Sequence, residues 1–248
     1  MYVKKKVIVF EHVKNENLEI LEEILLENNF IITKIKLYLN EKIPKDLFNF
    51  NLMIVLGGPM DTWMIDEYPW LNEEKLAIKK FAIELKKPFL GLCLGCQLLG
   101  EALGQTINKS KKQEVGFLNI STTPLMKNDK NFPTLPKKFK VFQWHSYEVS
   151  SFSNPDVDVL AFSNITESQI FRFCKHAYGI QFHFELKSDT IEKWSDNVSL
   201  KYQIEKLYGL GSIHTIAKVF EKELKTMNQI CIKFMKNFLK NIELIKSK

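Results

Sequence analysis

The segment from Pro88 to Gly104 constrains the fold of this chain more than any other stretch. It joins a short apolar run to a run with helical spacing through a Gly-x-Cys-x-Gly pattern centred on Cys93. Flanking glycines suit a sharp strand-to-helix turn, whose serine form is G-x-S-x-G, because the backbone there is crowded. At a helix N-terminus the dipole favours a thiolate, and free N–H groups can bind an oxyanion. The segment therefore predicts a cysteine nucleophile at a strand–helix junction.

The first half of the chain alternates apolar runs with helical patterns. We expect helices over 16–29 and 70–86, and strands over 6–10, 30–37, 51–56 and from Pro88. This strand–helix–strand order implies parallel strands with right-handed crossovers. The pattern predicts an α/β protein with an open, mostly parallel sheet flanked by helices. Ligands of such sheets bind beyond the carboxyl ends of the strands.

The second half of the chain has a different pattern. Short strand-like runs follow Gly104, over 114–123, 139–143, 157–163, 169–174 and 177–185. From Ser188 onward the pattern is helical, with a break over 208–212 and a long amphipathic helix after it, which most commonly would cover a sheet. The length suits one large domain. We predict a single domain over 1–248, with 188–248 as its C-terminal helical extension.

The net charge of +6 raises the question of nucleic-acid binding. Arg172 is the single arginine, although bidentate recognition of phosphate or guanine prefers a guanidinium. The lysines are interleaved with glutamates, which is typical of solvated helix faces. No apolar run approaches the ~18 residues of a membrane span, and the first ten residues lack the apolar region of a signal peptide. We expect a cytoplasmic protein that binds neither nucleic acid nor a membrane.

Four cysteines, Cys93, Cys96, Cys174 and Cys231, do not make the disulfide framework of a secreted protein at this length. Cys93 and Cys96 form a C-x-x-C pair, but a zinc ribbon would need a second such pair. A thioredoxin-like redox role for this pair stays an alternative. We predict no metal and no cofactor, and the sequence contains no G-x-x-x-x-G-K-[ST] loop for a nucleotide.

A cysteine that acts as an acyl-transfer nucleophile needs a base, and the base needs a group that orients it. Of the five histidines, only His183 ends an apolar run and has a carboxylate, Glu185, two residues later. Residues two apart in an extended segment point to the same side, so Glu185 could contact the ring of His183. A histidine after a strand can equally have a structural role.

A glycine pair, Gly57-Gly58, follows another strand-like run. Two glycines let backbone N–H groups approach a ligand closely, although a simple tight turn would also explain them. The loop after this pair contains three aromatic residues: Trp63, Tyr68 and Trp70. These aromatic side chains could contact a peptide substrate, form a docking surface or anchor the following helix.

Taken together, these motifs resemble the class I, triad-type glutamine amidotransferases. The resemblance rests on Gly-Leu-Cys-Leu-Gly-Cys-Gln at 91–97 and Gly-Ile-Gln-Phe-His-Phe-Glu at 179–185, and it extends from about 51 to 186. Gly-Gly-Pro at 57–59 and Gln-Trp-His-Ser at 143–146 look most like the stand-alone, GMP-synthase-like subgroup. The resemblance implies a flavodoxin-like fold.

The resemblance also implies a role for each matching position. Cys93 would be the nucleophile, His183 its base, and Glu185 the group that orients the base. The backbone N–H groups of Gly58 and Leu94 would form the oxyanion hole.

Two further positions match substrate contacts, and two depart from the family pattern. Gln97 matches a position that helps to hold glutamine. His145 follows a strand-like run near the rim of the site, where it would contact the substrate or satisfy a loop carbonyl. Phe184 stands where the family often has proline, which would change the exit of the strand. Cys96 stands where histidine or alanine is common, and its thiol would make the site oxidisable.

We therefore expect hydrolysis of the γ-glutamyl amide of glutamine, or of a γ-glutamyl compound, through a thioester on Cys93. Because no nucleotide loop is found, ammonia would pass to a separate synthetase, unless release of glutamate is itself the function. A non-catalytic relative that uses the pocket for binding or regulation is a third hypothesis. Such a protein would not require Cys93, His183 and Glu185 together.

Overall fold

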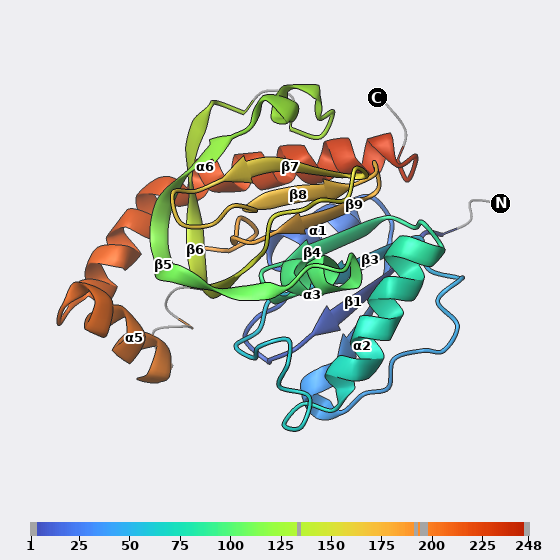
Figure 1. The fold of residues 1–248 in the computed structure, drawn as a ribbon, viewed down its shortest axis with the longest axis horizontal. Helices are drawn as coiled ribbons and strands as arrows, with labels where there is room; N and C mark the ends of the chain where they lie inside the picture. The colour runs from blue at the N-terminus through green and yellow to red at the C-terminus, as the bar shows by residue number, and fades with distance from the viewer. Residues whose placement is uncertain (1–3, 133–134, 191–192, 194–197, 246–248) are drawn as a thin grey trace.

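The computed structural model describes residues 4–132, 135–190, 193 and 198–245. Within these residues, nine strands form one open sheet in the order β2-β1-β3-β4-β9-β8-β7-β5-β6 (Figure 1). The strands are β1 (Lys6–Glu11), β2 (Ile31–Lys36), β3 (Leu52–Val55), β4 (Phe89–Leu92), β5 (Ile107–Thr122), β6 (Lys138–Val149), β7 (Val157–Phe162), β8 (Ile170–Phe173) and β9 (Ala177–Ile180). The predicted α/β class, an open sheet flanked by helices, is confirmed.

The first part of the sheet is parallel. Strands β2, β1, β3, β4 and β9 pair in that order and run in the same direction. Every residue of β3, β4 and β9 is buried, as expected for parallel strands with helices on both faces. Because these strands end at one edge of the sheet, the segments after β1, β3, β4 and β9 come together there.

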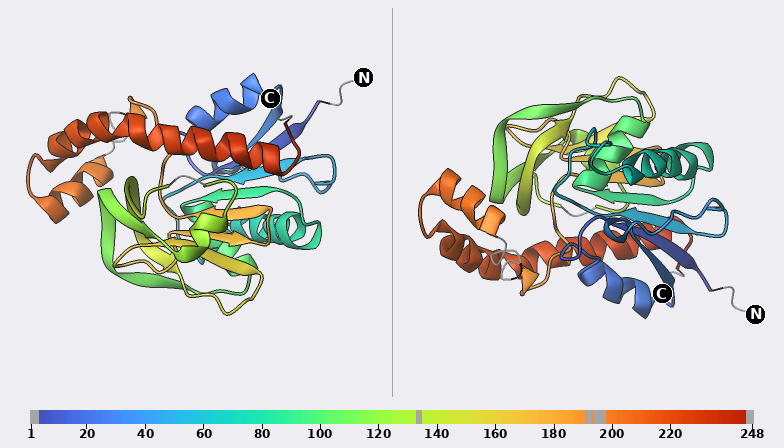
Figure 2. Two further views of the ribbon diagram at one scale, coloured as in Figure 1. Left: turned by 90° about the horizontal axis from the view of Figure 1, so that it is seen from above. Right: turned by 90° about the horizontal axis from the view of Figure 1, so that it is seen from below.

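The helices cover both faces of the sheet. They are α1 (Ile20–Glu27), α2 (Trp70–Ile78), α3 (Leu94–Ala102), α5 (Val198–Tyr208) and α6 (Ser212–Asn241), with short turns η1 (Leu37–Leu39) and η3 (Pro124–Asn128) and the π-helical η2 (Lys79–Glu84). One apolar cluster contains the buried side chains of α1 and α6, and a second contains those of α2, η2 and α3. Figure 2 shows α1 and α6 together on one side of the sheet.

The second part of the sheet is antiparallel. Strands β8, β7, β5 and β6 extend it beyond β9, and β5 and β6 form a long hairpin with an irregularity between Lys109 and Glu114. Both strands are longer than the predicted runs over 114–123 and 139–143. Their additional residues pair with each other and are mostly polar or solvent-accessible, so they lack the apolar pattern on which the prediction depended.

Two predicted boundaries in the region of the site were wrong. The helix expected over 16–29 begins at Ile20, so the preceding residues form a loop at the sheet edge. The helix expected over 70–86 is present, α-helical to Ile78 and π-helical over η2 to Glu84. The strand expected over 177–185 ends at Ile180, because β8 pairs with β9 only that far and the chain then turns towards β6.

The helix α6 covers one face of the sheet, as predicted. Its 30 residues bury an apolar stripe against that face: Phe220, Met227, Phe234 and Phe238. The hairpin of α5 and α6 extends beyond the sheet at the left of Figure 1. Residues 191–192, 194–197 and 246–248 of the predicted extension lie outside the described residues. In the part of the chain that is described, no helix combines the length and apolar character of a membrane span.

Candidate active site

Cys93 lies in a sharp turn between β4 and α3. Its φ of 49° is one that side chains rarely adopt, and it occupies the N-cap position of α3 with 7% of its surface exposed. A Cβ on Gly91 would stand 2.3 Å from the carbonyl oxygen of Gly95, and a Cβ on Gly95 would stand 2.2 Å from that of Val55. Both glycines are therefore required for close backbone packing, which explains the Gly-x-Cys-x-Gly pattern.

The loop after β9 brings His183 to this turn. The backbone N–H of His183 donates to the carbonyl of Phe142 on β6, at 2.9 Å. The ring Nδ1 lies 2.7 Å from Oε1 of Glu185, and both side chains are almost completely buried. The predicted contact between the two residues is therefore present, although they lie in a loop and not at the end of a strand.

The charge state of His183 is set by its two neighbours. Burial alone would lower the pKa of His183, because it disfavours the imidazolium. The Glu185 carboxylate and a hydrogen bond with Cys93 outweigh burial and raise the pKa of His183 well above its ordinary value. A charged imidazolium beside the sulfur favours the thiolate form of a cysteine.

Phe184 does not disrupt this arrangement. Its ring is fully buried and contacts the rings of Phe182 and Phe234, so the departure from proline places an aromatic anchor in the core. Its backbone N–H donates to Oε2 of Glu185 at 2.9 Å, a bond that proline could not make. Both oxygens of the Glu185 carboxylate are thus held, one by His183 and one by the backbone.

The glycine pair after β3 packs against the same residues. A Cβ on Gly57 would stand 2.9 Å from Cε1 of His183 and 3.4 Å from Cβ of Cys93. A Cβ on Gly58 would stand 3.2 Å from Cδ2 of Leu94, so the two predicted oxyanion-hole residues are neighbours. The N–H of Leu94 has no acceptor within its own helix, because the first turn of a helix leaves its N–H groups unpaired.

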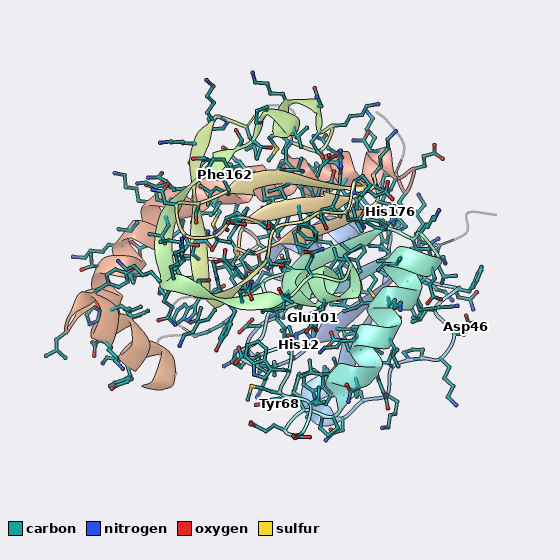
Figure 3. The ribbon with its side chains drawn as sticks, viewed as in Figure 1. His12, Asp46, Tyr68, Glu101, Phe162 and His176 are labelled. Atoms are coloured by element: carbon teal, nitrogen blue, oxygen red, sulfur yellow. The ribbon has the colours of Figure 1, made fainter. Side chains whose placement is uncertain are left out.

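A buried histidine that the sequence analysis missed supports this glycine loop. His12, labelled in Figure 3, follows β1. Its Nδ1 lies 2.7 Å from the carbonyl oxygen of Gly57, and its Nε2 lies 2.9 Å from Oε1 of Glu74 on α2. Burial alone would lower the pKa of His12, but Glu74 and the Gly57 carbonyl raise it above its ordinary value. Both ring nitrogens can therefore donate. Its position directly after β1, at the carboxyl edge of the sheet, was the available signal.

Gln97 lies on α3 and connects three parts of the site. Its Nε2 donates to the carbonyl of Tyr147 at 3.1 Å and to Oε1 of Gln181 at 3.3 Å. Nε2 of Gln181 lies 3.8 Å from the sulfur of Cys93. Both bonds use the side-chain amide nitrogen of Gln97. Its side-chain carbonyl oxygen is therefore left to accept a hydrogen bond from a ligand.

A cavity of about 300 Å³ opens over these residues. The described residues that line it are Glu16, Gly58, Pro59, Met60, Asp61, Cys93, Leu94, Gln97, Gln113, Trp144, His145, Ser146, Tyr147 and His183. It therefore collects every predicted site residue except Glu185, which lies behind His183. Its size is at the lower end of the range for small-molecule sites.

His145 lies within β6 and not after it, which corrects the predicted position. It is buried, and its ring nitrogens lie 3.0 Å from the carbonyl oxygen of Tyr147 and 3.0 Å from Oε1 of Gln143. Oε2 of Glu114 lies 3.3 Å from Nε2 of His145. Burial alone would raise the pKa of Glu114, but hydrogen bonds from His145 and Thr166 lower it. His145 thus satisfies protein acceptors while it lines the cavity, and its contact with substrate stays a prediction.

The three aromatic residues of the 61–70 loop have separate positions. Trp63 is 47% exposed and packs edge-on against Tyr147 at the rim, with ring centroids 4.7 Å apart. Trp70, the first residue of α2, stacks on His12, and Tyr68 contacts Trp70. The anchoring interpretation thus fits Tyr68 and Trp70, while Trp63 belongs to the rim.

The position of Cys96 does not favour the redox role that the C-x-x-C pattern suggested. Its side chain is fully buried in the apolar cluster under α3. Burial, with a smaller effect of Cys93, raises the pKa of the Cys96 thiol well above its ordinary value, which makes it a poor nucleophile. Among the described residues, no group of three or more His, Cys, Asp and Glu side chains is arranged to hold a metal ion.

Comparison with known families identifies the arrangement. The model of the class-I glutamine amidotransferase family matches residues 14–196. The chain belongs to this family. The match includes the turn at Cys93, the glycine pair and the loop with His183 and Glu185, so the resemblance inferred from the motifs is confirmed.

Individual proteins that are similar to this chain agree with the family match. A glutamine amidotransferase-like protein, L716, of Acanthamoeba polyphaga mimivirus is 28% identical over 230 residues, which are 88% of this chain and 97% of that protein. A subunit of the glutamine-hydrolyzing GMP synthase of Methanobrevibacter smithii is 38% identical over 111 residues, which are 44% of this chain and 54% of that protein. The crystal structure of a glutamine amidotransferase from Thermotoga maritima superposes with a TM-score of 0.85 at 26% identity, covering 96% of this chain and all of that one.

Proposed function

We propose that this amidotransferase-family chain hydrolyses the γ-glutamyl amide of glutamine, or of a related γ-glutamyl compound, through a thioester on Cys93. The observation that carries the proposal is the 2.7 Å contact of His183 Nδ1 with the Glu185 carboxylate, beside the Cys93 thiol. A cysteine, a base and a group that orients the base form the arrangement that activates a nucleophile.

In the first half of the reaction, His183 takes the proton of the Cys93 thiol, and the sulfur attacks the amide carbon to form an S–C bond. The N–H groups of Gly58 and Leu94 donate to the oxyanion that results. His183 then donates its proton to the leaving nitrogen as the C–N bond breaks. The products of this half are the free amine and a γ-glutamyl thioester.

In the second half, His183 removes a proton from a water molecule, whose oxygen attacks the thioester carbon. The C–S bond breaks, the sulfur of Cys93 regains a proton, and glutamate leaves. Glu185 keeps Nδ1 of His183 protonated, so that Nε2 faces the reacting atoms throughout. Gln97 offers its carbonyl oxygen to the amino group of the substrate, and His145 contributes to the wall of the site.

A second candidate is supply of ammonia to a separate synthetase. The similarity to a GMP synthase protein that is named as a subunit of that enzyme favours this form. We favour the stand-alone form because α6 covers a face of the sheet and acts as a closing element of the fold. A purely regulatory role is less favoured, since it would not require the buried contact between His183 and Glu185.

The test is glutamate release by the purified chain from glutamine and from a panel of γ-glutamyl amides and peptides. We expect Cys93→Ala to abolish release, because the variant lacks the thiol that lines the cavity beside His183. The matched control Cys96→Ala should keep most activity, because that thiol is buried in the core. Equal losses in both variants would favour a redox role for the pair. Release that appears only after addition of a synthetase would support the ammonia-supplying form instead.

A further inference from the structure

The loop between β1 and α1 brings one more acidic side chain to the site. Glu16 is half-buried and lines the main cavity together with Cys93 and His183. Its Oε2 and the Cε1 of His183 lie 2.5 Å and 2.9 Å from the point where a Cβ on Gly57 would stand. The carboxylate of Glu16 is therefore adjacent to the edge of the imidazole between its two nitrogens.

This carboxylate is not engaged by a hydrogen bond within the described protein. Among the described residues, Glu16 makes no hydrogen bond and no ion pair. Burial raises the pKa of Glu16, while the nearby His183 and His12 act in the opposite direction. A carboxylate in this position is available to interact with whatever part of the substrate approaches His183.

The proposed mechanism fixes how the substrate amide must be oriented, and so which part of the substrate lies near His183. The carbonyl oxygen of the amide must face the N–H groups of Gly58 and Leu94. The leaving nitrogen must face His183, because His183 donates its proton to that nitrogen. Since Glu16 adjoins the ring of His183, a substituent on the leaving nitrogen passes close to the Glu16 carboxylate.

Acidic side chains are frequent around this position, and the cationic ones are histidines. A small cavity of about 10 Å³, the space of roughly one water molecule, is lined by Glu16, Glu19, Glu185 and His183 among others. The main cavity also includes Asp61, and no lysine or arginine is among the described residues that line it. Apart from the histidines His183 and His145, a negative group on the leaving amine would find no basic side chain in this lining.

We propose that Glu16 determines the leaving-group specificity of the site, selecting γ-glutamyl amides of ammonia and of neutral or cationic amines and disfavouring γ-glutamyl peptides. In a γ-glutamyl peptide, the leaving amino acid carries a carboxylate two bonds from the leaving nitrogen. Two like charges at short range repel strongly where water is partly excluded. This inference rests on the proposed hydrolytic function and narrows its substrate class.

The experiment uses two substrates that differ in charge alone. γ-Glutamylglycinamide and γ-glutamylglycine have the same γ-glutamyl group and nearly the same shape, but only the second has a carboxylate on the leaving group. We expect the wild-type chain to prefer the amide by at least tenfold in kcat/KM at pH 8. Glu16→Gln should reduce that preference to within about threefold, mainly by improving turnover of γ-glutamylglycine.

A matched control separates this local effect from a change in total charge. Glu27→Gln removes one exposed carboxylate at the end of α1 and should keep the wild-type preference. If Glu16 instead held the amino group of the γ-glutamyl moiety, Glu16→Gln would slow both substrates equally. An unchanged ratio would therefore overturn the proposal.

A second measurement does not depend on turnover. Iodoacetamide and iodoacetate alkylate Cys93 and differ in charge in the same way as the two substrates. The measured quantity is the ratio of the alkylation rate with iodoacetate to the rate with iodoacetamide, obtained by mass spectrometry of the Cys93 peptide. Glu16→Gln should increase this ratio at least fivefold relative to the wild type. No change in this ratio overturns the role of Glu16. Absence of glutamate release together with a changed alkylation ratio would contradict the hydrolytic function while supporting the charge selection by Glu16.

Discussion

Replacement of Glu185 by glutamine tests the contact on which the proposed chemistry depends. Both oxygens of the Glu185 carboxylate accept hydrogen bonds, one from the ring of His183 at 2.7 Å and one from the backbone N–H of Phe184 at 2.9 Å. Glutamine has one oxygen and one amino group, so it must turn a donor towards one of these two donors. The substitution therefore removes a charge and also creates a conflict between donors, in a side chain that is almost fully buried.

The expected effect follows from the strength of such a bond. A hydrogen bond to a charged group contributes about 1.5–3 kcal/mol, and the bond to His183 matters most when the imidazolium forms. Loss of that energy from the transition state corresponds to a roughly ten- to 150-fold fall in kcat/KM. The assay is glutamate release from glutamine between pH 6 and 9, with Glu23→Gln as a control, because Glu23 is exposed on α1 and pairs with Lys187 at the surface. Activity of Glu185→Gln within twofold of wild type would refute the orienting role.

The same variant has a consequence for stability that depends on pH. Glu185 raises the pKa of His183 in the folded chain above the ordinary value. A raised pKa stabilises the fold fully at pH values below the pKa of the unfolded histidine, roughly 6.5, and this stabilisation is lost as pH rises through the folded pKa. The difference in unfolding free energy between wild type and Glu185→Gln should thus be largest near pH 6 and shrink towards pH 9, as measured by urea denaturation.

Other substitutions test the base and the glycines. His183→Asn should lower kcat by roughly 10²- to 10⁴-fold, since proton transfer is lost; a wild-type rate in the glutamate assay would mean that another histidine is the base. Gly57→Ala should lower kcat at least tenfold with little loss of thermal stability, because its Cβ would displace the flexible end of Glu16 and the ring of His183; unchanged kcat would contradict the packing at the glycine loop. Gly95→Ala should lower the unfolding free energy by about 3 kcal/mol or more in urea titrations, because its Cβ would meet backbone; a loss below about 1 kcal/mol would contradict the close approach to Val55.

Much of the fold and of the candidate site was predictable from local patterns. Apolar runs that end in glycines predicted β3 and β4, and the Gly-x-Cys-x-Gly pattern predicted the turn at Cys93, because a crowded backbone restricts side chains whatever surrounds it. The spacing of His183 and Glu185 predicted their contact for a related reason. Two positions separated by one residue are close in space in most extended conformations.

Other features depended on contacts between residues far apart in the sequence. The ends of β5 and β6 pair through backbone hydrogen bonds, which leave no apolar pattern, so their length was missed. His12 and Glu74 are 62 positions apart, and their contact exists only because β1 and α2 meet beside the glycine loop. A single polar residue in each of two distant segments gives no local signal of such a pair.

Glu16 is the clearest example of a residue whose position depends on tertiary contacts and not on the local sequence. The local sequence predicts a helix that begins at Glu16, and an exposed glutamate is ordinary at that position. The sequence alone was enough to predict the turn at Cys93 with its flanking glycines and the contact between His183 and Glu185, because those depend on neighbouring residues and backbone geometry. Only the tertiary structure decided that α1 begins at Ile20 and leaves Glu16 in a loop, since the carboxyl ends of β1, β3 and β4 converge there and bring its carboxylate to His183.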